Sequence, residues 1–78
     1  MNNKTVEHLN VGESGIIGAI TAPKEIKRRL MDMGFTRGIQ VNVVKRAPMG
    51  DPIEVNIRGY NLCIRKEQAS NLQLRDKA

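Results

Sequence analysis

Apolar and polar residues alternate without interruption along residues 53–58, Ile-Glu-Val-Asn-Ile-Arg. A period of two residues is that of a β-strand with one face buried and the other exposed. The same period recurs in residues 39–46 and in residues 60–65. Gly59 lies between residues 53–58 and residues 60–65. Segments this short and this closely joined predict antiparallel strands linked by hairpins.

Two further segments complete the expected sheet. Residues 14–20 are rich in isoleucine and contain two glycines, which indicate a bent strand or a close backbone approach. Residues 72–75 suit a last short strand, and residues 5–9 and 66–71 each suit a single helical turn. Too few helices separate the strands for a parallel sheet. The expected fold is therefore mainly β with one main α-helix, a small antiparallel barrel whose closure removes exposed strand edges.

Residues 23–33 are expected to form the main helix. Pro23 suits the first helical position, where a missing N–H is tolerated. Three apolar residues recur at helical spacing and are expected to form a buried stripe: Ile26, Leu30 and Met33. Gly34 is expected to end the helix in a left-handed conformation, which lets Phe35 fold back onto Leu30.

The length of 78 residues predicts one domain spanning 1–78, with residues 1–4 and 76–78 frayed. No apolar run approaches the roughly 20 residues that span a bilayer, and the first residues lack the apolar core of a signal peptide. The single cysteine, Cys63, excludes an internal disulfide. These features predict a cytoplasmic protein.

The formal net charge of +5 favours nucleic acid, an anionic membrane or an acidic protein as a partner. Basic residues are equally common on the solvated faces of small domains. Proteins that bind single-stranded nucleic acid usually stack bases on aromatic side chains. Only Phe35 and Tyr60 are aromatic, and both are expected in the core, so the stacking platform is missing and we expect no nucleic-acid partner.

The residues that could carry chemistry are too scattered to predict an enzyme. A nucleophile–base pair would have to combine Cys63 with His8, the only histidine, and nothing in the sequence orients either side chain. No Cys-x-x-Cys or His-x-x-x-His spacing is present to hold a metal. A metal site would need both residues and carboxylates such as Glu7, Asp32 or Asp51. We therefore expect no cofactor, and leave room only for weak transition-metal binding.

The predicted helix offers a first candidate surface for a partner. Its solvent face gathers four residues: Lys24, Lys27, Arg28 and Met31. A flexible thioether among cations suits an adaptable protein contact. An ordinary solvated face with one exposed methionine would have the same composition.

The segment 47–52 offers a second candidate surface. Its two prolines stiffen it, so that it loses little entropy on binding. Met49 is the apolar tip, and Asp51 either caps turn amides or meets a basic partner. A well-built hairpin loop would explain the same residues.

Several short motifs, spread over nearly the whole chain, match a known family. They are Arg28-Arg29-Leu30, Met33-Gly34-Phe35, Gly38, Ala47-Pro48-Met49-Gly50-Asp51-Pro52, Gly59-Tyr60-Asn61-Leu62 and Arg65-Lys66-Glu67-Gln68-Ala69, with Leu9, Gly12 and Ile20 extending the match toward the start. By these motifs the chain resembles the ferrous iron transport protein A family, FeoA. The Ala-Pro-x-Gly-Asp-Pro loop is a specific signature, whereas Cys63 departs from the small residue expected at its position.

The resemblance implies an SH3-like (Src-homology-3-like) β-barrel with an inserted helix. It also implies a small cytosolic accessory to FeoB, the membrane ferrous iron transporter with a guanine-nucleotide-binding domain. The first hypothesis is therefore a protein-interaction module that binds and modulates the cytosolic part of FeoB. Such a module would reach the inner face of the cell membrane only through its partner, and weak self-association is left open. The alternatives are a metal- or nucleotide-sensing module and, last, a basic nucleic-acid-binding barrel.

Overall fold

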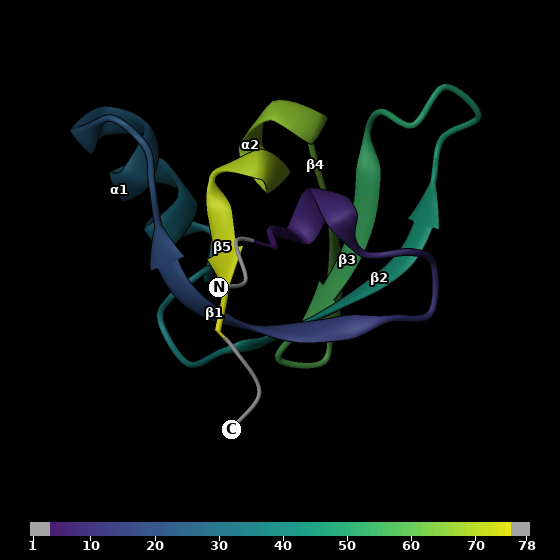
Figure 1. Cartoon of the computed structure of the whole chain (residues 1–78), viewed down its shortest axis with the longest axis horizontal. Coiled ribbons are helices and arrows are strands. Elements are labelled where there is room, and N and C mark those ends of the chain that lie inside the picture. The colour runs from purple at the N-terminus through teal and green to yellow at the C-terminus, as the bar shows by residue number, and fades with distance from the viewer. Residues whose placement is uncertain (1–3, 76–78) are drawn as a thin grey trace.

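The alternating segments form neighbouring strands of one antiparallel sheet in the computed structural model, which describes residues 4–75. They are β2 (Gln40–Arg46), β3 (Ile53–Ile57) and β4 (Tyr60–Ile64), and the sheet is completed by β1 (Ser14–Ile20) and β5 (Leu72–Leu74). The strand order is β4-β3-β2-β1-β5, and the sheet curls around the core (Figure 1). The prediction of a mainly β fold with one main helix is confirmed.

β1 changes its partner halfway along its length. Residues 14–16 pair with β2, whereas residues 17–20 pair with β5, with a register irregularity between Ile17 and Ala19. At Gly18 a Cβ would lie 3.1 Å from the Arg75 backbone, which is tighter than ordinary packing allows. The glycine therefore permits the close backbone approach that the sequence predicts for this strand.

The inner faces of the strands make a single core. Its buried apolar residues are Val6, Leu9, Ile17, Leu30, Phe35, Val41, Val43, Ile53, Val55, Ile57, Ile64, Ala69 and Leu72. Two short helices, η1 (Val6–His8) and α2 (Lys66–Ser70), lie against each other at one end of the core. Both match the predicted single turns, and each contributes a fully buried side chain, Val6 and Ala69.

Helix α1 (Lys24–Asp32) begins one residue later than predicted. Pro23 is its N-cap with an extended ψ of 154°, and its carbonyl oxygen accepts the first helical hydrogen bond, from Lys27. At the other end the Phe35 N–H donates to Leu30 O over 3.1 Å and the Gly34 N–H donates to Met31 O over 3.0 Å. This pair of bonds is a Schellman cap, and it confirms the predicted termination at Gly34.

The predicted buried stripe of α1 is wrong in part. Leu30 is fully buried, but Ile26 is 39% exposed and Met33 is only partly buried. The reason is that α1 stands at one end of the molecule beside β1, and does not lie across the sheet (Figure 1). Only the C-terminal half of the helix reaches the core, so most of its surface packs against nothing within residues 4–75.

Tyr60, which was expected in the core, is 46% exposed and lies outside it. It pairs with Ile57 at the end of the β3–β4 hairpin. From there its hydroxyl donates to the Met33 carbonyl oxygen over 2.9 Å. Tyr60 therefore satisfies a carbonyl group at the end of α1, and ties the helix to the hairpin.

Gly34→Ala should destabilise the protein by about 2 kcal/mol. Gly34 has a φ of +113°, and a Cβ would lie 2.7 Å from Tyr60 Oη and 3.0 Å from Ile57 Cδ1. Gly59→Ala is the matched control, since Gly59 has a φ of +86° but no atom within 4 Å of an added Cβ. It should cost only about 1 kcal/mol of backbone strain. Denaturant melts that show equal losses for the two variants would refute the steric contribution at Gly34.

Candidate partner-binding surface

The exposed side chains of α1 divide into two flanks around Leu30. With 3.6 residues per turn, Lys27 lies about 60°, Met31 about 100° and Lys24 about 120° from Leu30 in one direction. Arg28 lies about 160° away, on the side of the helix that is opposite the core. The four residues of the predicted surface therefore lie within about 100° of one another on one side of the helix, and Arg28 is the one farthest from the core.

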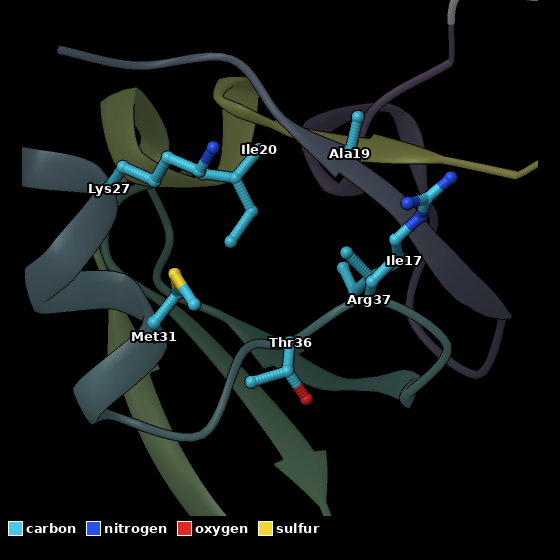
Figure 2. Close-up of a pocket in the computed structure, with 8 residues that line it drawn as sticks. Ile17, Ala19, Ile20, Lys27, Met31, Thr36 and Arg37 are labelled. Atoms are coloured by element: carbon cyan, nitrogen blue, oxygen red, sulfur yellow. The ribbon is translucent and has the colours of Figure 1, made fainter. Parts of the chain in front are cut away.

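A groove separates this flank of α1 from β1, and Figure 2 shows it. It has a volume of ≈ 420 Å³. Residues 17–20 of β1 form one wall, Lys27 and Met31 of α1 form the opposite wall, and Thr36 and Arg37 close one end. Among residues 4–75 the lining is apolar apart from Thr36 and the two cationic side chains, and it includes no carboxylate.

The groove is the feature that sequence reasoning missed. The sequence placed Met31 among cations on an outer face, whereas the structure places it on a wall of the groove with 46% of its surface exposed. The groove depends on the angle at which residues 33–38 hold α1 beside β1. No local pattern in the sequence reports that angle, so only the placement of Lys27 and Met31 on one flank was predictable.

Met49 lies at the tip of the loop between β2 and β3 and is 91% exposed. The loop is closed by hydrogen bonds from the Gly50 N–H to Ala47 O, 2.7 Å, and from the Ala47 N–H to Pro52 O, 3.1 Å. These bonds agree with a well-formed turn that presents an apolar side chain. They favour neither the binding role nor the plain hairpin loop.

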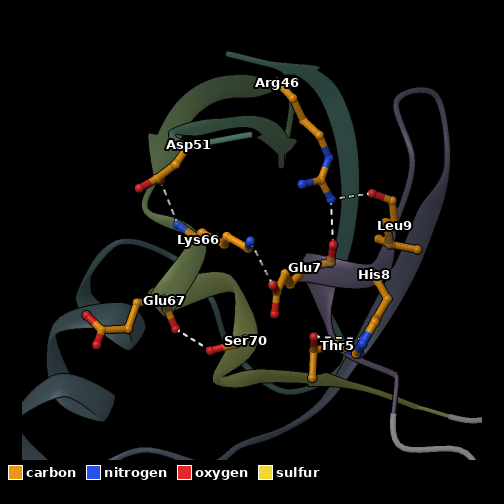
Figure 3. A network of polar contacts seen from close by, with 9 residues as sticks. All are labelled: Thr5, Glu7, His8, Leu9, Arg46, Asp51, Lys66, Glu67 and Ser70. Atoms are coloured by element: carbon orange, nitrogen blue, oxygen red, sulfur yellow. Dashed lines mark hydrogen bonds and ion pairs between the residues drawn. The ribbon is translucent and has the colours of Figure 1, made fainter. Parts of the chain in front are cut away.

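Asp51 in the same loop has a partner inside the chain. Its Oδ1 accepts a hydrogen bond of 2.8 Å from the Lys66 backbone N–H at the start of α2, and its Oδ2 lies 3.7 Å from Arg65 Nη1. Lys66 Nζ in turn lies 3.7 Å from Glu7 Oε2 (Figure 3). Of the two roles expected for Asp51, the geometry therefore favours capping of backbone amides.

Arg46 extends the same network toward the N-terminal segment. Its Nη2 donates to the carbonyl oxygens of Glu7, 2.5 Å, and Leu9, 2.6 Å (Figure 3). Together these contacts fasten η1, α2 and the β2–β3 loop to one another. The network stabilises the fold, because its charged groups contact backbone atoms and each other.

The two predicted surfaces are not neighbours. Figure 1 shows α1 and the β2–β3 loop at opposite ends of the longest axis of the molecule, with α2 between them. The structure therefore brings the four predicted residues of α1 together, Arg28 included, and leaves Met49 as a separate exposed point. A partner that contacts both would have to span the molecule.

His8 and Cys63 show no arrangement for catalysis. The His8 Nδ1 accepts a hydrogen bond of 3.0 Å from the Thr5 N–H, so the imidazole is oriented by η1, contrary to expectation. Cys63 is exposed on β4. Within residues 4–75 no three His, Cys, Asp or Glu side chains gather as a metal site would require. Among these residues no helix is long and apolar enough to cross a membrane.

Residues 4–76 match the model of the FeoA domain family. A curated relative, the Fe(2+) transport protein A/Fe(2+) transporter FeoB fusion protein of Porphyromonas gingivalis, is 29% identical over 69 residues. That match covers 88% of this chain but only 8% of the relative. The chain thus corresponds to a small part of that relative's length.

Two solved structures are similar over nearly the whole chain. The FeoA-like protein of Clostridium acetobutylicum has a TM-score of 0.87 and 30% identity, covering 96% of this chain and 88% of that one. FeoA of Stenotrophomonas maltophilia, solved with zinc and described as a prokaryotic SH3 domain protein, has a TM-score of 0.80 and 25% identity, covering 92% and 89%. The expected SH3-like fold is confirmed.

Asp51→Ala should destabilise the protein by about 1 kcal/mol, because the Lys66 N–H loses the acceptor that caps α2. Asp51→Asn should recover most of this loss, since an amide oxygen accepts the same hydrogen bond. Met49→Ala, in the same loop, should leave stability unchanged because the side chain is exposed. If chemical denaturation gave Asp51→Ala the stability of the parent, the capping role would be wrong.

Proposed function

The chain belongs to the FeoA family, and from this premise we propose that it acts by binding the cytosolic part of an FeoB-type ferrous iron transporter. The family serves ferrous iron transport as an accessory domain without catalysis of its own, in agreement with the expectation that the chain is not an enzyme. In this proposal the chain works in the cytoplasm and reaches the membrane only through its partner.

The observation that carries the proposal is the fused relative. In the Porphyromonas gingivalis protein the two named parts, transport protein A and transporter FeoB, share one polypeptide. A covalent link holds two domains at a high effective concentration and so favours their contact. A separate chain of the same family would need a surface that supplies this contact through affinity alone.

Helix α1 is the part of the chain best suited to supply that surface. It buries one side chain, Leu30, and leaves Ile26 and Met31 substantially exposed. Lys24 and Lys27 lie on the same flank as Met31. Central apolar anchors usually dominate the affinity of an interface, while charges at its rim mostly govern the association rate. We assign these two roles to Met31 and to the lysines respectively.

The remaining predicted residues have smaller roles in this proposal. Arg28 lies about 40° from Lys24 around α1, farther from the core, and contributes to the electrostatic field around the helix. Met49 is a second, independent contact point, and Asp51 supports it by fixing the loop against α2. The nucleic-acid alternative has weak support because Phe35 is buried, which leaves Tyr60 as the one exposed aromatic side chain in the sequence.

Met31→Asp should weaken binding to the purified cytosolic part of FeoB by at least about tenfold, because it places a charge where an apolar anchor is needed. Lys27→Glu should weaken binding less, and should reduce its dependence on salt. Titration calorimetry at two salt concentrations measures both effects, and circular dichroism checks that the variants fold.

Val11→Asp is the control, since Val11 is 57% exposed and lies in the turn before β1, away from α1. It should bind like the parent. If the parent itself shows no binding, the proposed function fails. If Val11→Asp and Met31→Asp weaken binding equally, the assignment of the surface to α1 fails.

A further inference from the structure

The second half of β1 has one free edge. On the side of β2, the last backbone bonds of the strand are made by Ile17, whose N–H donates to Ile39 O over 2.9 Å and whose oxygen accepts from the Gly38 N–H over 2.8 Å. Beyond this point residues 18–20 pair only with β5, on the opposite side. The free edge is the wall of the groove that faces α1.

The alternation of backbone groups along a strand assigns the direction of the Ile20 N–H and C=O. The next residue, Thr21, donates its N–H to Asn71 O over 2.8 Å on the side of β5. Successive residues of a strand direct their N–H and C=O to opposite sides, so those of Ile20 point away from β5. In the part of the chain that the structure describes, no strand lies beside Ile20 on that side.

The side chains around this edge select for the chemistry of an occupant. Met31 and the partly buried Ile20 border the hollow, which offers a place for one apolar side chain. Lys27 reaches toward β1 from the helix, and Arg37 extends along the other end of the groove (Figure 2). The described residues of the lining supply two cations and no carboxylate, so they attract negative charge.

We propose that this groove binds an extended acidic segment of the partner, which adds a strand to the free edge of β1 at residues 18–20. In this mode, main-chain hydrogen bonds supply affinity and the groove supplies specificity. The segment forms backbone hydrogen bonds with Ile20, places an apolar side chain against Met31, and directs carboxylates to Lys27 and Arg37. The inference rests on the proposed function, because the segment is assigned to the FeoB-type partner.

A second copy of this chain is a poorer occupant. Two copies that paired through this edge would bring the same cationic side chains together, and the chain as a whole carries a net charge of +5. Like charges brought together without counter-charges oppose association. An acidic segment therefore matches the groove, whereas another copy does not.

The first test compares two double variants that change the charge equally. Lys27→Glu with Arg37→Glu reverses both groove cations, and Arg58→Glu with Lys45→Glu reverses two exposed cations away from α1 and the groove. We expect the dissociation constant for the FeoB cytosolic part to rise at least about tenfold for the groove pair, and less than about threefold for the control pair.

The second test follows strand addition at single backbone amides by NMR-detected hydrogen exchange. Addition of the FeoB cytosolic part should slow exchange of the Ile20 N–H. The Thr21 N–H, which is already bonded to Asn71 O, should change less and serves as an internal reference. This readout separates a new hydrogen bond from a purely electrostatic contact, since both would respond to the charge variants.

The outcomes separate this inference from the proposed function. If the parent binds FeoB, but the groove pair binds like the control pair or exchange at Ile20 is unchanged, strand addition in the groove is wrong while the proposed function stands. If the parent does not bind FeoB, both fail. If the double variant of the groove changes only the sedimentation of the chain measured without FeoB, the occupant is a second copy and the inference is overturned.

Discussion

The change of partner along β1 organises the whole molecule. By pairing first with β2 and then with β5, this strand adds β5 to the curled sheet and so helps to enclose one core. The change also leaves the second half of the strand unpaired on its β2 side. The chain departs from β1 into α1 and returns into β2, so the helix stands beside that open edge (Figure 1). The addition of β5 to the sheet and the open edge beside the groove therefore share one origin.

The position of α1 follows from two contacts at its C-terminal end. Leu30 is fully buried, and the Schellman bonds at Gly34 bring Phe35 into the core directly behind it. Tyr60 adds a hydrogen bond from the β3–β4 hairpin to Met33. Because these contacts hold only one end and one edge of the helix, the basic and apolar side chains on its other faces stay available to a partner.

Much of the fold could be predicted from the sequence because the strands obey a strict local rule. The two-residue period located β2, β3 and β4, and the glycine at 34 located the end of α1. Ile26 and Tyr60 were misplaced because their burial depends on how α1 and the hairpin sit on the barrel, which spacing does not encode. For the same reason the groove could not be predicted, although Lys27 and Met31 were recognised as residues of one surface.

Photo-cross-linking from α1 in intact membranes would decide where the partner binds. A photoreactive amino acid at position 31 would report on the groove, and one at position 49 would report on the tip of the β2–β3 loop at the opposite end of the molecule. A groove-bound partner predicts that position 31 gives a covalent adduct with FeoB that disappears in membranes lacking FeoB. An adduct from position 49 with none from position 31, or none from either, would contradict a partner bound at α1.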